Sequence, residues 1–207
     1  IARIDVKNEY AIKGIHLEGL RVLGTPNSFA KYYYNQGADE LIYMDVVASL
    51  YGRNGLFDVV RKTSEDVFIP ITVGGGLRSI DDISVALKSG ADKVCINTAA
   101  INDNELISRA ADKFGSSTIV IAIEAIRQSN GEYHAFTDNG REQTGIEVVD
   151  WANKVEEFGA GEILLTSVDV EGTGNGPDME LINSVANEAL DNQNNQAIVS
   201  FTFDRIG

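Results

Sequence analysis

The chain has 207 residues, of which 43% are hydrophobic and 23% charged, a composition typical of a single globular domain. Its 17 Lys and Arg residues stand against 31 Asp and Glu residues, and the resulting net charge of −14 argues against a protein that binds nucleic-acid backbones. A single cysteine, Cys95, excludes an internal disulfide and a cysteine-based zinc site. Since neither a membrane-spanning run nor a signal peptide is recognisable, we expect a cytoplasmic protein without a membrane partner.

Short apolar runs alternate with helical patterns along the chain. The runs are rich in β-branched residues, as strands buried on both faces are, and lie at 1–6, 41–46, 69–73, 93–97, 119–124, 162–168 and 197–201. The helical patterns lie at 27–36, 54–65, 79–89, 103–114, 145–158 and 178–190. Strict alternation predicts an α/β fold with a parallel sheet, either open or closed into a barrel.

Capping signals mark several of the predicted helix ends. Thr25 precedes a proline at the first helical position, and Ser79 and Thr144 each open a capping-box pattern. Glycines suited to left-handed C-terminal caps follow four of the helices: Gly37, Gly90, Gly115 and Gly159.

An internal repeat favours the barrel over an open sheet. The segment NQGADELI at 35–42 returns as EFGAGEIL at 157–164, after 122 residues. Two half-barrels, about 1–118 and 119–207, would together build a (β/α)8 barrel of the TIM type as one domain. The glycines at 74–76 have no counterpart at 201–203, so we expect the barrel to be incomplete after about strand 7.

Two acidic residues occupy equivalent places in the repeat, at the ends of the first and fifth predicted strands. In barrels of this class the carboxyl ends of the strands form the active site, so Asp5 and Glu124 should face each other across its mouth. Such a pair suits general acid and general base work. The alternative interpretation is that these acids cap helices or bind neighbouring amides.

A glycine run follows the third predicted strand and a polar pair follows the fourth. Gly74, Gly75 and Gly76 could offer backbone N–H groups to a phosphate, beside Asn97 and Thr98. The alternative for the glycines is an ordinary turn. Lys13, in the loop predicted after the first strand, could reach over a substrate or remain a solvated loop residue.

Eight segments together resemble the cyclase subunits of imidazole glycerol phosphate synthase, the HisF family of histidine biosynthesis, over residues 1–196. They are IDVK at 4–7, IKG at 12–14, GADEL at 37–41, TVGGG at 72–76, GADKV at 90–94, INTAA at 96–100, GAGEILLTS at 159–167 and DVEGT at 169–173. The resemblance implies a (β/α)8 barrel whose substrate is a bis-phosphorylated aminoimidazole carboxamide ribonucleotide. Ammonia from a glutaminase partner attacks it to give imidazole glycerol phosphate and aminoimidazole carboxamide ribotide, with no metal and no organic cofactor.

The resemblance also assigns roles to residues. Asp5 and Glu124 match the catalytic acid/base pair, and Lys13 matches a lysine that closes over substrate. Residues that match or flank the phosphate-binding and mouth-facing positions are Gly74, Gly75, Gly76, Asn97, Thr98, Asp45, Thr166, Glu171 and Gly172. Three residues match a charged ring through which ammonia enters: Glu40, Lys93 and Glu162.

Departures from the family pattern keep two further interpretations open. Glu124 stands where the family has aspartate, and position 171 is usually aspartate as well. The longer side chain at 124 displaces the carboxylate, and a displacement of order 1 Å can cost about a hundredfold in rate. The first alternative is a HisF-like subunit that supplies ammonia to surface-sugar (lipopolysaccharide) biosynthesis. The second is an inactive barrel that only binds a partner or associates with itself.

Overall fold

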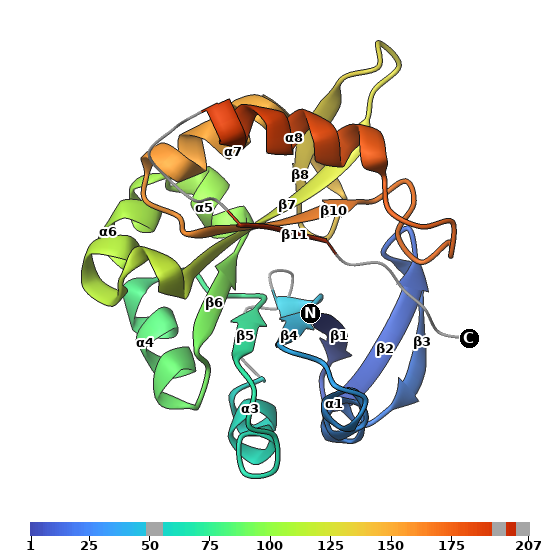
Figure 1. The fold of residues 1–207 in the computed structure, drawn as a ribbon, viewed down its shortest axis with the longest axis vertical. Coiled ribbons are helices and arrows are strands. Elements are labelled where there is room, and N and C mark those ends of the chain that lie inside the picture. Colours follow the sequence, from blue (N-terminus) through green and yellow to red (C-terminus); the bar gives the residue numbers. More distant parts are fainter. Residues whose placement is uncertain (49–55, 192–197, 202–207) are drawn as a thin grey trace.

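The computed structural model describes residues 1–48, 56–191 and 198–201. Seven of its strands run parallel in one curved sheet, in the order β11-β10-β7-β6-β5-β4-β1 (Figure 1). Their bounds are β1 Ala2–Lys7, β4 Leu41–Asp45, β5 Ile71–Gly74, β6 Lys93–Ile96, β7 Ile119–Arg127, β10 Glu162–Ser167 and β11 Ile198–Phe201. All seven predicted strands are therefore present, although position 197 of the last one lies outside the described residues.

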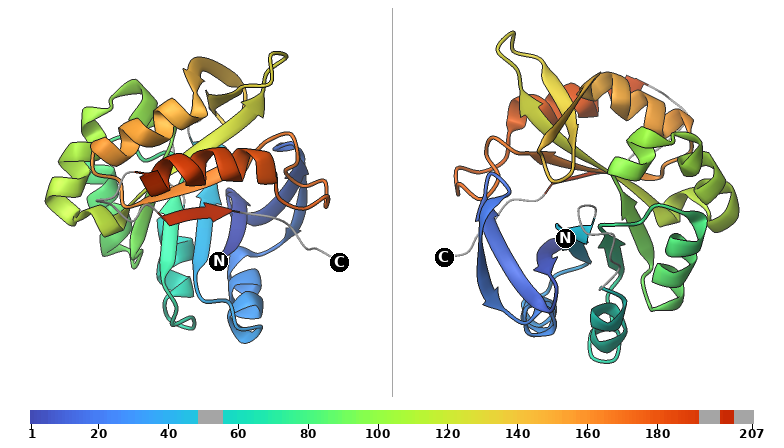
Figure 2. Two further views of the ribbon diagram at one scale, coloured as in Figure 1. Left: turned by 45° about the horizontal axis from the view of Figure 1, so that its top comes forward. Right: turned by 180° about the vertical axis from the view of Figure 1, so that it is seen from behind.

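Helices cover the outer face of this sheet, and the strands surround an interior (Figures 1 and 2). The helices are α1 Pro26–Asn35, α3 Phe57–Thr63, α4 Ile80–Lys88, α5 Thr98–Asn102, α6 Glu105–Phe114, α7 Val148–Glu157 and α8 Met179–Asp191, with a 3-10 turn at Ser116–Thr118. Six of them were expected, and α5 was not. Positions 54–55 of the second expected helix, at 54–65, lie outside the described residues. No helix of the described part of the chain is long and apolar enough to cross a membrane.

The arrangement is that of a (β/α) barrel, as the repeat predicted. Within the described residues, however, β11 pairs only with β10 and no strand joins it to β1, so the sheet is curved but not closed. The place equivalent to the glycine run falls at 201–203, and of these positions only Phe201 lies within the described residues.

The prediction of strict alternation is wrong at two places, where antiparallel hairpins interrupt it. The first follows β1 as β2 Tyr10–Ile15 and β3 Glu18–Gly24, and the second follows β7 as β8 Tyr133–Thr137 and β9 Glu142–Glu147. The β2–β3 turn is formed by His16 and Leu17, with φ of 53° and 61°. Two positive φ values are typical of a hairpin turn, but the usual Asn-Gly or Asp-Gly signal is missing here, which is why the sequence did not reveal the hairpin.

Of two further predicted caps, one is confirmed in position and one is wrong. Thr25 is the residue before α1, with a proline at the start of the helix as predicted, but its hydroxyl makes no capping bond and donates to the Ser28 hydroxyl at 3.0 Å. Thr144 lies in β9 and donates to the Ala135 carbonyl at 2.6 Å, so the residue that caps α7 is Glu147. The second hairpin therefore shifts the start of this helix by three residues along the chain.

The remaining capping predictions are confirmed. The Ser79 hydroxyl accepts a hydrogen bond from the Asp82 backbone N–H at 3.1 Å. A positive φ is found at each of the predicted C-terminal glycines: Gly37, Gly90, Gly115 and Gly159.

The strand residues alternate between an outer core and an interior cluster. Outward side chains such as Val94 and Ile121 pack with Trp151 and the covering helices. Five inward side chains form the interior cluster, with Met44 packed against it: Ile42, Cys95, Val120, Ala122 and Leu164. Cys95 is thus a buried free thiol, and burial raises its pKa to about 12.

Candidate active site

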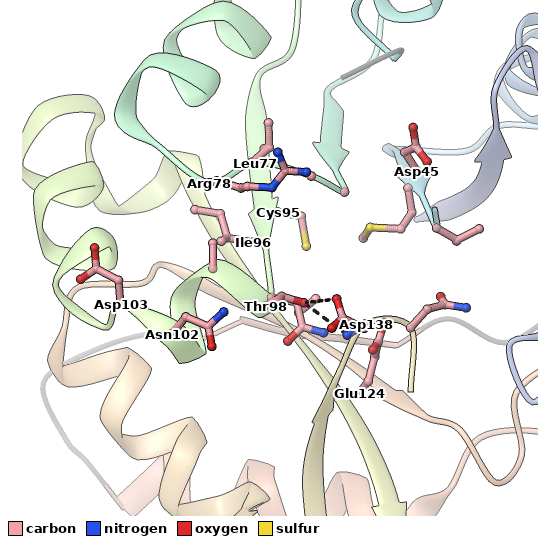
Figure 3. Close-up of a pocket in the computed structure, with 18 residues that line it drawn as sticks. Asp45, Leu77, Arg78, Cys95, Ile96, Thr98, Asn102, Asp103, Glu124 and Asp138 are labelled. Atoms are coloured by element: carbon pink, nitrogen blue, oxygen red, sulfur yellow. Dashed lines mark hydrogen bonds between the residues drawn. The ribbon is translucent and has the colours of Figure 1, made fainter. Parts of the chain in front are cut away.

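A cavity of about 420 Å³ opens at the carboxyl ends of β4, β5, β6 and β7 (Figure 3). This volume is in the range of pockets that hold small molecules. Met44, Cys95 and Ala122 contribute to its wall, so the cavity reaches down to the interior cluster. Polar residues and further apolar ones such as Val46 and Leu77 supply the rest of the lining, and most of them come from the loops after these strands.

The glycine loop and the polar pair after β6 line the same cavity. Gly75, Gly76, Asn97 and Thr98 are all lining residues, whereas Gly74 is buried as the last residue of β5. Gly75 has a φ of +96°, and a Cβ there would overlap the carbonyl oxygen of Asp45 and come within 2.8 Å of its carbonyl carbon. Only glycine fits this close approach, which leaves the backbone of the loop free to face a ligand.

The second hairpin closes over Asn97 and Thr98. The Thr98 hydroxyl accepts a hydrogen bond from the Asp138 backbone N–H at 3.3 Å (Figure 3). Asn97 Nδ2 donates to the Phe136 carbonyl at 3.3 Å. Asn97 Oδ1 is buried and has no hydrogen-bond partner among the described residues. A buried acceptor left unpaired is costly, so this oxygen is a candidate to receive a donor from a ligand.

Sequence reasoning missed Arg78, which lines the cavity just after the glycine loop (Figure 3). Its Nη2 donates to the Ala48 carbonyl at 2.9 Å. Arg78 is the only basic residue among the described ones that line the cavity, where the acidic ones are Asp45, Asp103, Glu124 and Asp138. It directly precedes the Ser79 cap of α4, and a basic residue between a glycine loop and a helix start is the signal that could have found it.

Glu124 is a half-buried acid of this cavity. It lies in β7 beside Thr166 of β10, and its Oε2 accepts a hydrogen bond from the Gly140 backbone N–H at 2.8 Å. Burial raises the pKa of Glu124 to about 7, although the Arg3 charge and the Gly140 bond act in the opposite direction. A carboxyl group that titrates near neutral pH can both donate and accept a proton during a reaction.

Asp5 lies outside this cavity, in a group of four charged residues that we call the Arg3 cluster: Arg3, Asp5, Lys13 and Glu171. Arg3 Nε is 2.7 Å from Asp5 Oδ1, and Lys13 Nζ is 2.5 Å from Glu171 Oε1. Lys13, Asp5 and Glu171 line a narrower cleft, which adjoins the cavity at Val46 and Asn139 and has no room for a water-sized molecule. Lys13 lies in β2, not in a loop as predicted, because the first hairpin occupies that part of the chain.

The other mouth-facing candidates lie either in the cavity or beside the Arg3 cluster. Asp45 lines the cavity and accepts a hydrogen bond from the Val47 backbone N–H at 3.0 Å. Thr166 lies beside the Arg3 cluster, since its hydroxyl accepts a hydrogen bond from Arg3 Nη1 at 3.1 Å. Gly172 packs so closely on Gly14 that a Cβ would overlap the Gly14 carbonyl oxygen.

The opposite end of the barrel carries the predicted charged ring. Lys93 Nζ lies 3.1 Å from Glu40 Oε2 and 2.8 Å from Glu162 Oε2. Partial burial alone would lower the pKa of Lys93, but the two carboxylates outweigh it and raise the pKa above its usual value. The interior cluster lies between this ring and the cavity.

The described part of the chain contains no group of three or more His, Cys, Asp or Glu side chains arranged to hold a metal ion.

Residues 1–195 match the sequence model of the histidine biosynthesis protein family. An imidazole glycerol phosphate synthase subunit HisF from Legionella pneumophila is 62% identical over 186 residues, covering 90% of this chain and 88% of that protein. The subunit of the same name from Methanopyrus kandleri is 46% identical over 202 residues, which cover 89% and 74% of the two chains. That from Streptomyces avermitilis is 47% identical over 182 residues, which cover 88% and 72%. These names do not favour the surface-sugar or the non-catalytic alternative.

Proposed function

Because the chain belongs to the histidine biosynthesis protein family, among the HisF subunits of imidazole glycerol phosphate synthase, we propose that its cavity performs their cyclase reaction. Ammonia adds to a bis-phosphorylated aminoimidazole carboxamide ribonucleotide. Ring closure and elimination then release imidazole glycerol phosphate and aminoimidazole carboxamide ribotide. Each of these stages moves protons, so the site needs a protonatable group beside a firmly held substrate.

One observation carries the proposal: a glycine loop suited to an anion and a protonatable carboxyl group line the same cavity. Gly75 and Gly76 offer backbone N–H groups, with Asn97 and Thr98 beside them, to one phosphate of the substrate. Glu124, whose pKa is raised to about 7, is the proton-transfer group. Asp5, which has Lys13 beside it, supplies the second carboxyl group of the predicted acid/base pair. Asp45, Thr166, Glu171 and Gly172 complete the mouth.

The ring at the opposite end supports a role for a glutaminase partner. Glu40, Lys93 and Glu162 surround the interior where the strands begin, and a partner bound there could release ammonia into the barrel. The interior cluster offers an apolar route that suits neutral ammonia better than ammonium, since burying an unpaired ion is costly. The route ends at the cavity, whose wall includes Cys95 and Ala122.

The test is turnover of this substrate with an ammonium salt as the nitrogen source, which makes the partner unnecessary. We expect the wild-type chain to turn over the substrate. For Glu124→Gln we expect a loss of about 100-fold or more in kcat, the usual range for a general acid or base. Glu132→Gln is the matched control, because Glu132 is an exposed acid in the connection between β7 and β8. Absence of turnover at millimolar ammonium, or equal rates for wild type and Glu124→Gln, would contradict the proposal.

A further inference from the structure

Asp138 lines the cavity but has no part in the reaction as proposed above. Its φ of 53° and that of 62° at Asn139 are both left-handed. Most side chains disfavour this conformation, whereas Asp and Asn tolerate it. The turn between β8 and β9 thus places Asp138 in the cavity lining, beside Thr98 and Glu124 (Figure 3).

The hydroxyl group of Thr98 is engaged by Asp138 on both sides. It accepts a hydrogen bond from the Asp138 backbone N–H at 3.3 Å, and it donates to Asp138 Oδ1 at 3.5 Å, which is a long hydrogen bond (Figure 3). A hydroxyl group has only one proton to donate. While this contact holds, the side chain of Thr98 therefore has no proton left for a phosphate oxygen.

The carboxylate of Asp138 can accept further hydrogen bonds. The other three acidic residues that line the cavity, Asp45, Asp103 and Glu124, each accept a hydrogen bond of 3.0 Å or less. Among the described residues, the Asp138 carboxylate accepts only the long bond from Thr98. An ionised carboxylate has about four acceptor positions, so most of those on Asp138 are open to a ligand.

A carboxylate can accept hydrogen bonds but cannot donate them, so it selects among the groups of a ligand. It attracts O–H and N–H donors and repels the oxygens of a phosphate, which are also anionic. The same cavity offers an anion the glycine loop at Gly75 and Gly76 and the side chain of Arg78. A ligand is complementary to both features when hydroxyl groups follow its phosphate along one chain.

We propose that Asp138 determines the specificity of the phosphate-binding end of the cavity, because its carboxylate accepts hydrogen bonds from hydroxyl groups next to the phosphate of the ligand. The ligand class is a phosphorylated open-chain polyol, and a phosphate ester without hydroxyl groups is disfavoured. The proposal rests on the proposed function and extends it, since imidazole glycerol phosphate carries two hydroxyl groups between its ring and its phosphate.

Two phosphate esters isolate the contribution of the hydroxyl groups. Glycerol 3-phosphate and propyl phosphate have the same three-carbon chain and differ only in two hydroxyl groups. Isothermal calorimetry on the full chain at pH 8, where both esters are dianions, measures the two affinities. We expect the wild type to bind glycerol 3-phosphate at least about tenfold more tightly, which is the contribution of one hydrogen bond to a charged group.

Two variants remove the charge of Asp138 without straining the turn, since Asn and Gly both tolerate a positive φ. The preference for glycerol 3-phosphate should disappear in Asp138→Gly and shrink in Asp138→Asn, whose amide oxygen still accepts. Propyl phosphate should bind both variants more tightly than wild type, because a like charge has been removed. Glu142→Gln, which removes an exposed acid from β9 of the same hairpin, should change neither affinity.

Four results would overturn the proposal: no preference in wild type, a preference that survives in Asp138→Gly, an equal loss of affinity for both esters in that variant, or binding of neither ester to wild type at millimolar concentration. The equal loss would make Asp138 a structural support of the turn. Turnover of the ribonucleotide with an ammonium salt decides the proposed function separately. A wild type without turnover would refute that function, while the two affinities would still decide the role of Asp138.

Discussion

Replacing Gly75 by alanine adds one methyl group at the point where two loops of the cavity meet. The new Cβ would overlap the carbonyl oxygen of Asp45, with the carbonyl carbon at 2.8 Å and Asp45 Cβ at 2.9 Å. Ordinary contact begins at 3.4 Å, so the two loops would have to separate by at least about 0.6 Å. The left-handed φ of +96° adds a cost of about 1–2 kcal/mol for any residue with a Cβ.

The displacement should weaken anion binding as well as stability. If Gly75 and Gly76 hold a phosphate by backbone N–H groups, loss of one such bond costs about 1.5–3 kcal/mol. This corresponds to about 10- to 100-fold in affinity for inorganic phosphate. Isothermal calorimetry would measure the affinity, and urea unfolding would measure the stability.

Gly131→Ala is the matched control for this change. Gly131 has a φ of +93°, but a Cβ there would meet nothing within 4 Å. The control therefore carries the conformational cost without the clash, and it leaves the cavity intact. The reasoning is refuted if Gly75→Ala and Gly131→Ala have equal stability and bind phosphate equally, or if wild type binds no phosphate at millimolar concentration.

Four further outcomes follow from the same geometry. The pKa of Glu124, about 7 in the folded chain against an ordinary 4.5, means that the folded state binds more protons between these values. Its stability therefore falls as pH rises through this window, and urea unfolding should find Glu124→Gln more stable than wild type by about 3 kcal/mol at pH 8, with no difference below pH 4.5. Lys93→Met leaves Glu162 buried without this partner and should lower the unfolding free energy by about 1–3 kcal/mol in the same assay. Arg78→Ala should weaken phosphate binding about tenfold, with Arg78→Lys in between, as calorimetry would show. Cys95, with a pKa of about 12, should resist iodoacetamide at pH 8 in the folded chain and react in urea.

Sequence periodicity predicted the parallel strands because each is a short apolar run buried on both faces. Leu41 to Asp45 and Glu162 to Ser167 form β4 and β10 close to the predicted positions. The hairpins after β1 and β7 were missed for a physical reason. Their strands are largely half-exposed or polar, as in the EQTGIE segment of β9, and the turn at His16 and Leu17 lacks the usual residues.

The glycine loop beside Asn97 and Thr98 could be predicted from strand ends, since parallel strands bring their ends together, whereas the charged ring came from the resemblance to the HisF family. Side-chain pairing could not be predicted in this way. Nothing in the spacing of Arg3 and Asp5 indicates that the arginine crosses the interior to Thr166. Nor does the repeat indicate that Glu124 lines the open cavity while Asp5 lines a narrower cleft beside it. Such contacts depend on the curvature of the whole sheet.

The most direct test of the proposed cyclase activity follows the nitrogen atom itself. The full chain would be incubated at pH 8 with the bis-phosphorylated ribonucleotide and nitrogen-15 ammonium chloride. The masses of the products would then be measured by mass spectrometry. Cyclisation with added ammonia predicts one heavy nitrogen in imidazole glycerol phosphate and none in aminoimidazole carboxamide ribotide. Unconsumed substrate, or products without the label, would contradict the account.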